Sequence, residues 1–154
     1  MEIFRVPRRL VHVRLLLDDG RTVEGRLFTA LSGPDGRPER LIDHLNDPTE
    51  EFIPFAIGED RLLIGKAGIV YVQLAERPDE IEGVAGAGRG RRAAVRLTLT
   101  GGISLLGQLA IDMPPERSRV VDYLNAAPRF LPLAGEGQVT LVQRNHVVSA
   151  RSED

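Results

Sequence analysis

The sequence predicts a mainly β protein made of two tandem small bent-sheet barrels, each with about five strands and one short helical turn. Three observations lead to this prediction. Segments of the first half recur in the same order in the second half. Short runs alternate apolar and polar residues, as strands with one buried face do. The second strand of each half contains a glycine, Gly25 or Gly107, at the equivalent position.

The internal repeat consists of four ordered matches. The matching segments, first half before second, are residues 13–17 and 95–99, 43–46 and 122–125, 52–55 and 130–133, and 64–69 and 142–147. Chance can produce one such match but not four in a single order. We therefore predict that the two halves are copies of one fold.

Three segments follow from the repeat: a first module at residues 1–76, a linker at 77–92 and a second module at 93–154. The linker is rich in glycine and charge and poor in apolar residues, which is typical of a flexible connection. It ends in the basic cluster Arg89, Arg91 and Arg92. This cluster is either part of a solvated linker or an arginine–glycine contact to RNA.

Each module is predicted to contain two hairpins, a helical turn and a final strand. In the first module the strands are expected at residues 11–17, 22–29, 52–57, 61–64 and 69–74, and the helical turn at 40–46. Gly20 supplies the positive φ that the first hairpin turn needs. Gly25 and Gly107 mark a bulge, a sharp bend or a close backbone approach, and strongly bent strands close a small sheet into a barrel.

Composition excludes several classes of protein. The 154 residues include no cysteine, which rules out disulfides, thiolate zinc sites and cysteine nucleophiles. The formal net charge of -2 gives no general attraction to nucleic acid. Apolar runs fall short of the roughly 20 residues that cross a bilayer, and the start of the chain lacks a signal-peptide core. We expect a soluble cytoplasmic protein without a membrane partner.

The sequence shows no pattern of catalytic residues. His12, His44 and His146 do not have the spacing of metal ligands. The glycines at residues 83–90 are not followed by the lysine and hydroxyl residue of a phosphate-binding loop, and the serines lack a nucleophile-elbow context. We therefore predict no catalytic residue, no metal site, no cofactor and no enzymatic activity.

The repeated Asp-x-Leu-Asn motif is the most informative one. It comprises residues 43–46 in the first half and 122–125 in the second. A structural interpretation has the aspartate bind nearby backbone and the asparagine form a turn at the end of the helix. A functional interpretation places both polar side chains at a ligand-facing rim.

These residues resemble a motif of the Sm-like proteins, the family that includes Hfq and archaeal Lsm proteins. The family's first motif joins a strand of the type "dGr…G.L" to a segment Asp-x-x-x-Asn. It is matched here by residues 19–21, Gly25, Leu27, Asp43 and Asn46. The chain departs from the family in three ways. The Asp–Asn spacing is one residue short, a helical turn is inserted, and no helix is predicted before the first strand.

The family's second motif is a basic residue at the tip of the last hairpin, followed by an apolar strand. Lys66 and Ile69 are similar to it, and Arg144 and Val147 are their counterparts in the second half. The resemblance implies five-stranded bent barrels that pair in rings through strand edges, with two modules per chain halving the number of chains. The RNA contacts that it implies are Asn46, Lys66, Asn125, Arg144 and Asn145.

The first functional prediction is a non-catalytic small-barrel module for assembly that also binds RNA. The alternative is a bacterial regulatory module that binds another protein and no nucleic acid, which the low aromatic content of 5% favours. A third is an enzyme whose site is shared between the modules. The final strands at residues 69–72 and 147–150 are apolar and lack proline, so their edges are poorly protected. These edges either pair with each other across the repeat, which gives one compact monomeric domain, or pair with a second chain. In the second case we expect homo-oligomers or a protein partner to form through strand edges.

Overall fold

The computed structural model describes residues 8–32, 36–75 and 91–153. The first half contains β1 (Arg8–Leu17), β2 (Thr22–Ala30), α1 (Leu41–Asn46), β3 (Phe52–Ile57), β4 (Asp60–Gly65), the 3₁₀ turn η1 (Lys66–Gly68) and β5 (Ile69–Ala75). The second half contains β6 (Arg91–Leu99), β7 (Ser104–Ile111), η3 (Pro115–Arg117), α3 (Val120–Ala126), β8 (Phe130–Gly135), β9 (Gln138–Gln143), η4 (Arg144–His146) and β10 (Val147–Ser152). The prediction of a mainly β protein with a short helix in each half is confirmed.

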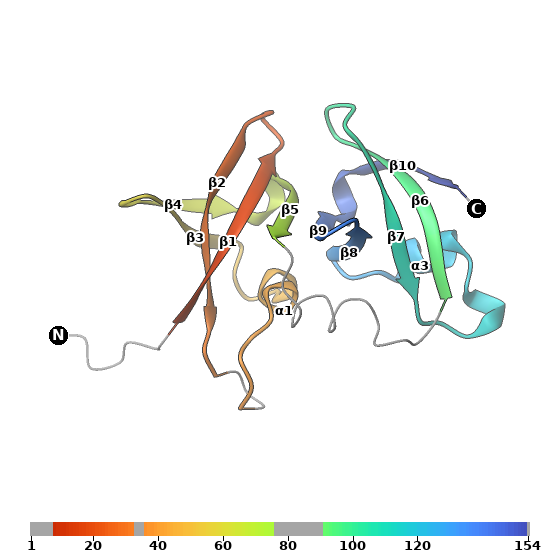
Figure 1. The fold of residues 1–154 in the computed structure, drawn as a ribbon, viewed down its shortest axis with the longest axis horizontal. Coiled ribbons are helices and arrows are strands. Elements are labelled where there is room, and N and C mark those ends of the chain that lie inside the picture. Colours follow the sequence, from red (N-terminus) through yellow and green to blue (C-terminus); the bar gives the residue numbers. More distant parts are fainter. Residues whose placement is uncertain (1–7, 33–35, 76–90, 154) are drawn as a thin grey trace.

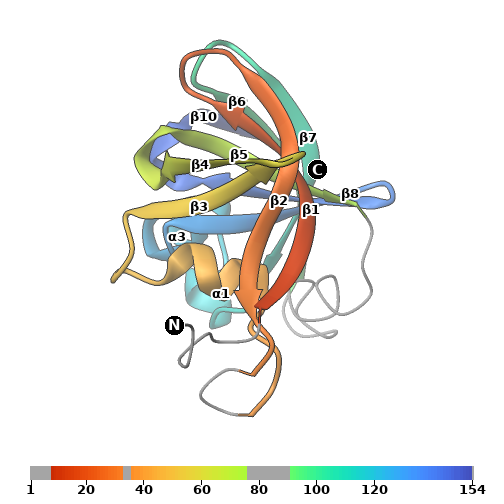
Figure 2. The ribbon, with the colours of Figure 1, turned by 90° about the vertical axis from the view of Figure 1, so that its left-hand side faces the viewer.

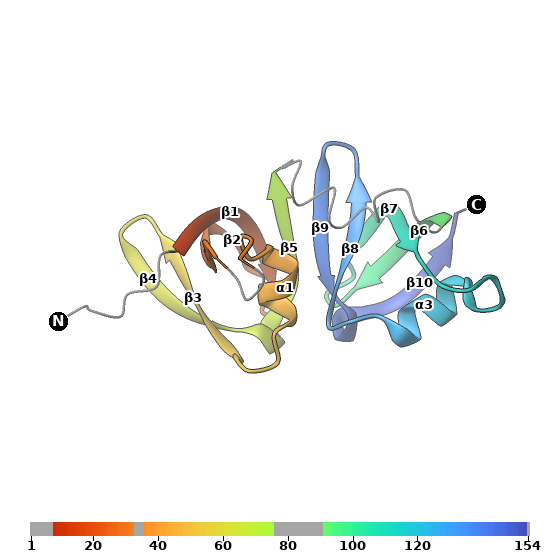
Figure 3. The ribbon, with the colours of Figure 1, turned by 90° about the horizontal axis from the view of Figure 1, so that it is seen from below.

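The ten strands are antiparallel and form one sheet with the order β10-β6-β7-β8-β9-β5-β1-β2-β3-β4 (Figure 1). Within the first half the order is β5-β1-β2-β3-β4, and within the second it is β10-β6-β7-β8-β9. These orders are equivalent strand for strand, as the internal repeat predicts. The strands of each half curl into a strongly bent sheet (Figure 3), and each half contains a cluster of buried apolar side chains.

The sheet differs from the prediction of two tandem small barrels, each closed or nearly closed. It is continuous, because β5 of the first half pairs with β9 of the second in a register that places Tyr71 opposite Val142. It is also open, since β4 is bonded only to β3 and β10 only to β6. Neither half closes on itself, because β5 of the first half pairs with β9 of the second half. Strand β5 is therefore not bonded to β4, and β9 is not bonded to β10.

The predicted linker also ends earlier than expected. The second half begins at Arg91 rather than at residue 93, because Arg91 and Arg92 pair with Ile111 and Ala110 of β7. These two arginines therefore belong to a strand. The remaining predicted linker residues, with Arg89 among them, lie outside the described residues.

Glycines allow the bends that the sequence predicted. Gly20 has a φ of 90°, which the hairpin turn between β1 and β2 requires. A Cβ at Gly25 would lie 2.3 Å from the carbonyl oxygen of Ala56, and one at Gly107 would lie 2.6 Å from Leu133. Only glycine permits this close approach, so β2 and β7 bend over β3 and β8 in the same way.

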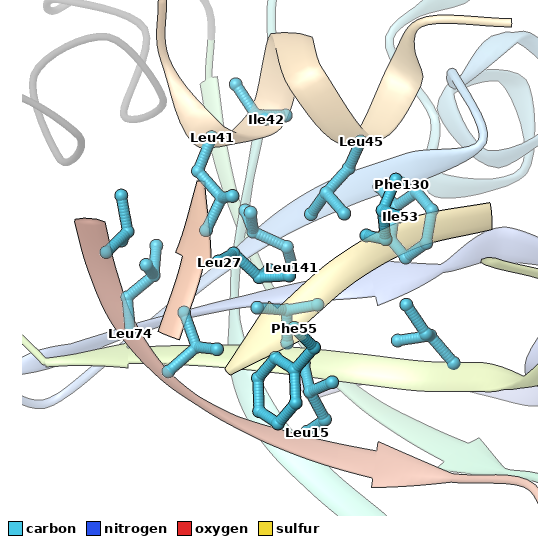
Figure 4. Close-up of a cluster of buried hydrophobic side chains, with 14 of the residues drawn as sticks. Leu15, Leu27, Leu41, Ile42, Leu45, Ile53, Phe55, Leu74, Phe130 and Leu141 are labelled. Atoms are coloured by element: carbon cyan, nitrogen blue, oxygen red, sulfur yellow. The ribbon is translucent and has the colours of Figure 1, made fainter. Parts of the chain in front are cut away.

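The two halves share their hydrophobic cores. The first core, which lies under α1, includes Phe130, Val139 and Leu141 of the second half (Figure 4). The second core includes Leu16 and Val70 of the first half. Because each core is completed by residues of the other half, we expect the halves to fold as one cooperative unit.

The two open edges lie at opposite ends of the molecule. Strand β4 lies at one end of the longest axis and β10 at the other (Figure 1), and Figure 2 views the sheet from the β4 end. Within the described residues, no helix is long and apolar enough to span a membrane.

Candidate assembly interface

Asn46 ties α1 of the first half to the second half. Its Nδ2 donates to the carbonyl oxygen of Phe130 at 3.0 Å, and its Oδ1 accepts from the N–H of Phe130 at 2.7 Å. One side-chain amide thus satisfies both polar backbone groups of the first residue of β8, as a neighbouring strand would. The ring of Phe130 lies beside Leu45 and Ile53, fully buried in the core of the first half (Figure 4).

Glu51 and Arg129 form an ion pair across the same junction. The guanidinium binds the carboxylate through two nitrogens, at 2.7 and 3.3 Å. This hydrogen-bonded pairing lowers the pKa of the exposed Glu51 carboxyl below its ordinary value. The Nε of Arg129 also donates to Gln143 at 2.8 Å, which links the ion pair to β9.

Two further side chains of the second half bind backbone carbonyls of the first. The amide nitrogen of Gln143 donates to the carbonyl oxygens of Lys66 at 2.9 Å and Ile69 at 2.6 Å. The Nε2 of His146 donates to the carbonyl oxygen of Ala67 at 2.8 Å. The junction therefore combines strand pairing, an inserted aromatic ring and five polar side chains.

Lys66 and Arg144 hold the ends of the two helices rather than standing free. The buried ammonium of Lys66 donates to the carbonyl oxygens of His44 and Asp47, at 3.3 and 2.8 Å. The guanidinium of Arg144 donates to the carbonyl oxygen of Ala127 at 2.6 Å, at the equivalent place in the second half. Burial lowers the pKa of Lys66. Both cations thus satisfy carbonyls at helix C-termini.

The edge strand β4 and the adjoining start of β3 expose residues whose counterparts are buried at the junction. The side chain of Phe52 is 67% exposed, whereas its counterpart Phe130 is fully buried. Leu63 is 72% exposed, whereas its counterpart Leu141 is fully buried. The exposed surface of the first half at β4 is therefore equivalent to the surface of the second half that is buried at the junction.

The β10 edge is the matching open side of the second half. Val148 is 70% exposed, whereas its counterpart Val70 is buried in the shared core. A groove of 490 Å³ runs between α3 and β10 and is lined by Leu124, Asn125, Arg144, Val147, Val148, Ser149 and Ala150. The equivalent space of the first half holds Phe130. Among the described residues, the side-chain amide of Asn125 has no hydrogen-bond partner.

The predicted RNA contacts do not form one surface. They are Asn46, Lys66, Arg89, Arg91, Arg92, Asn125, Arg144 and Asn145, and Arg89 lies outside the described residues. Arg91 and Arg92 begin β6, while Arg144 and Asn145 precede β10, whose first residue pairs with the end of β6. At about 3.3 Å per residue, the length of β6 separates these two groups by roughly 25 Å.

Among these residues, only some side chains are exposed. Arg91, Arg92, Asn125 and Asn145 are exposed, and the Nε of Arg91 donates to the carbonyl oxygen of Ser118 at 2.8 Å. Within the part of the chain that the structure describes, no group of three or more histidine or carboxylate side chains is arranged to hold a metal ion.

Sequence reasoning identified the Asp-x-Leu-Asn repeat but not what its asparagine binds. The structural interpretation predicted a turn at Asn46, yet the residue that follows α1, Asp47, is extended with a φ of -67°. The aspartate does bind nearby backbone in the second half, where Asp122 accepts from the N–H of Arg119 at 3.3 Å. Glu51, Arg129 and Gln143 were missed, because each binds a partner in the other half of the chain that the order of residues does not reveal.

Comparisons of the chain with family models, with curated proteins and with solved structures found no match.

Proposed function

We propose that this chain is a non-catalytic assembly module whose β10 edge pairs with the β4 edge of another copy. One observation carries the proposal: the pairing of β5 with β9 already joins a fifth strand to a fourth strand within the chain. The open edges are again a fifth strand, β10, and a fourth strand, β4. The two free edges are thus equivalent to the two strands that pair at the junction within the chain.

The exposed edges support self-association on physical grounds. An unpaired strand leaves rows of backbone donors and acceptors open, and apolar side chains on it favour pairing with another chain. Because β4 and β10 differ and lie at opposite ends, their contact is heterologous and propagates from head to tail. In this arrangement each half acts as a module similar to an Sm-like protein, completed by its neighbour's strand.

We do not extend the proposal to RNA. The ammonium of Lys66 is buried and bonded to two carbonyls, and the guanidinium of Arg144 is bonded to the end of α3. The basic residues at the start of β6 lie far from those before β10. A second copy of this chain would cover both open strand edges and the exposed apolar side chains on them.

Light scattering at two concentrations about 50-fold apart tests the proposal, because association follows mass action. We expect a mass above 16.9 kDa that increases with concentration. Leu63→Glu should return the protein to 16.9 kDa by placing a charge on the β4 edge. Leu106→Glu, at another exposed leucine on β7, is the matched control and should leave the mass unchanged. A wild-type mass of 16.9 kDa at both concentrations would overturn the proposal.

A further inference from the structure

We infer that the groove between α3 and β10 binds Phe52 of a second copy. The side-chain amide of Asn125 binds the backbone N–H and carbonyl of that Phe52. This inference rests on the proposed self-association and names the residues that determine it. It assigns to Asn125 a partner, the N–H and carbonyl of Phe52, that no contact within one chain supplies.

The assignment follows from the equivalence of the two halves. Asn46 on α1 corresponds to Asn125 on α3, and Phe52 at the start of β3 corresponds to Phe130 at the start of β8. The Asn46 amide binds both backbone groups of Phe130. Repeating this contact one step further along the assembly places Asn125 against the backbone of Phe52 in the next copy.

The groove has the chemistry that this occupant needs. Its apolar walls come from Leu124, Val147 and Val148, and its polar group is the unpartnered amide of Asn125. In the first half, the corresponding space takes the aromatic ring and backbone of Phe130. Phe52 is 67% exposed on its own chain, so docking would remove an aromatic ring from water.

Charge determines which halves can be neighbours. At the internal junction, Glu51 of the first half meets Arg129 of the second. Repeating the contact brings Arg129 to Glu51 of the next copy, so glutamate and arginine alternate along the assembly. A contact between two first halves would place Glu51 beside Glu51, and a contact between two second halves would place Arg129 beside Arg129. Repulsion between these like charges disfavours both the contact of two first halves and the contact of two second halves.

Two side chains that bind backbone carbonyls at the junction within the chain have no equivalent at the inferred junction between chains. Gly65 stands at the position of Gln143, and Gly68 stands at the position of His146, so neither can donate a side-chain hydrogen bond. The junction between chains therefore has less hydrogen bonding than the junction within the chain. We expect the association to be reversible and dependent on concentration.

The internal register also predicts the pairing between chains. Tyr71 lies opposite Val142, and Val72 lies opposite Leu141. The equivalent pairs are Ser149 with Ile64 and Ala150 with Leu63 of the second copy. Arg151 then lies diagonally across from Asp60 on the same face of the sheet, within reach of a favourable charge pair.

The first test compares the same substitution at the two equivalent asparagines. Asn125→Ala should raise the dissociation constant of self-association by about tenfold or more while leaving the urea midpoint of unfolding unchanged. Asn46→Ala should instead lower the urea midpoint, because its amide bonds two backbone groups of Phe130 in the same chain. Equal dissociation constants for Asn125→Ala and wild-type protein would overturn the inference.

The second test uses disulfide formation between chains, since the protein has no cysteine of its own. A double variant with Ala150→Cys and Leu63→Cys should form covalent dimers and longer multimers on mild oxidation, read on a denaturing gel. Ala150→Cys with Asp60→Cys is the control, and it should crosslink far less because position 60 is out of register. Equal crosslinking of the two pairs, or dimers alone, would contradict the inferred junction. Association of the wild-type protein that Leu63→Glu abolishes, without register-specific crosslinking, would refute only the inference and leave the proposed function standing.

Discussion

Phe130 and Phe52 occupy equivalent positions in the repeat but opposite environments, so replacing each by alanine gives a sharp test. Phe130 is fully buried in the core of the other half, whereas Phe52 is 67% exposed. Burying about 200 Å² of aromatic surface at about 25 cal/mol per Å² stabilises the fold by about 5 kcal/mol. Core replacements of phenylalanine by alanine cost about 3–5 kcal/mol. We expect Phe130→Ala to lower the free energy of unfolding by about 4 kcal/mol.

Phe52→Ala should lower the free energy of unfolding by about 1 kcal/mol or less, because only a third of its surface is already out of water. Urea unfolding followed by far-ultraviolet circular dichroism measures both effects, since the chain has no tryptophan. The measurement is made at a protein concentration low enough for the monomer to predominate, so that association does not contribute.

Because the two cores share residues, we expect wild-type protein and both variants to unfold in one transition. The slope of the free energy against urea should then remain unchanged. Similar losses of stability in the two variants would show that Phe130 does not anchor the halves together. A separate early transition in wild-type protein would show that the halves are independent domains.

Two further predictions concern the positions where the halves differ. Gly65→Gln should strengthen self-association roughly tenfold, because the new amide can donate to two carbonyls as Gln143 does within the chain. An unchanged association constant would argue against the equivalence of the junctions. Since burial lowers the pKa of Lys66, the unfolded chain binds more protons at this group than the folded protein between the lowered and ordinary pKa values. Its contribution to the free energy of unfolding should therefore rise with pH in that alkaline window, and Lys66→Met should remove the rise. Urea unfolding of both proteins from about pH 8 to about pH 10.5 checks this, and parallel pH profiles would contradict it.

Local structure could be predicted from local sequence. The alternation of apolar residues and the glycine turns predicted β3 at residues 52–57, as the structure has it, and predicted the helix at residues 41–46 to within one residue. The sequence also predicted a bulge, a sharp bend or a close backbone approach at Gly25 and Gly107, and the structure has the close approach at both. These features depend on backbone conformation and on contacts between neighbouring strands, which the order of residues largely specifies.

The candidate interface could be predicted only in part. The repeat identified Asn46, Lys66 and their counterparts as positions that both halves keep, and the apolar final strands indicated exposed edges. The sequence did not show that the Lys66 ammonium is buried against two carbonyls. A basic residue before an apolar strand has the same pattern whether its side chain points to solvent or into a helix end, so the pattern cannot distinguish the two.

The sequence by itself therefore determined a mainly β chain with an internal repeat, its turns, its short helices and its lack of cysteine. Only the tertiary structure decided that β5 pairs with β9, which makes one open sheet from ten strands. Strand edges carry backbone groups that are the same in every sequence, so the choice of partner depends on packing between distant segments. That packing places Phe130 in the core of the first half and leaves Phe52 and the Asn125 groove exposed at opposite ends.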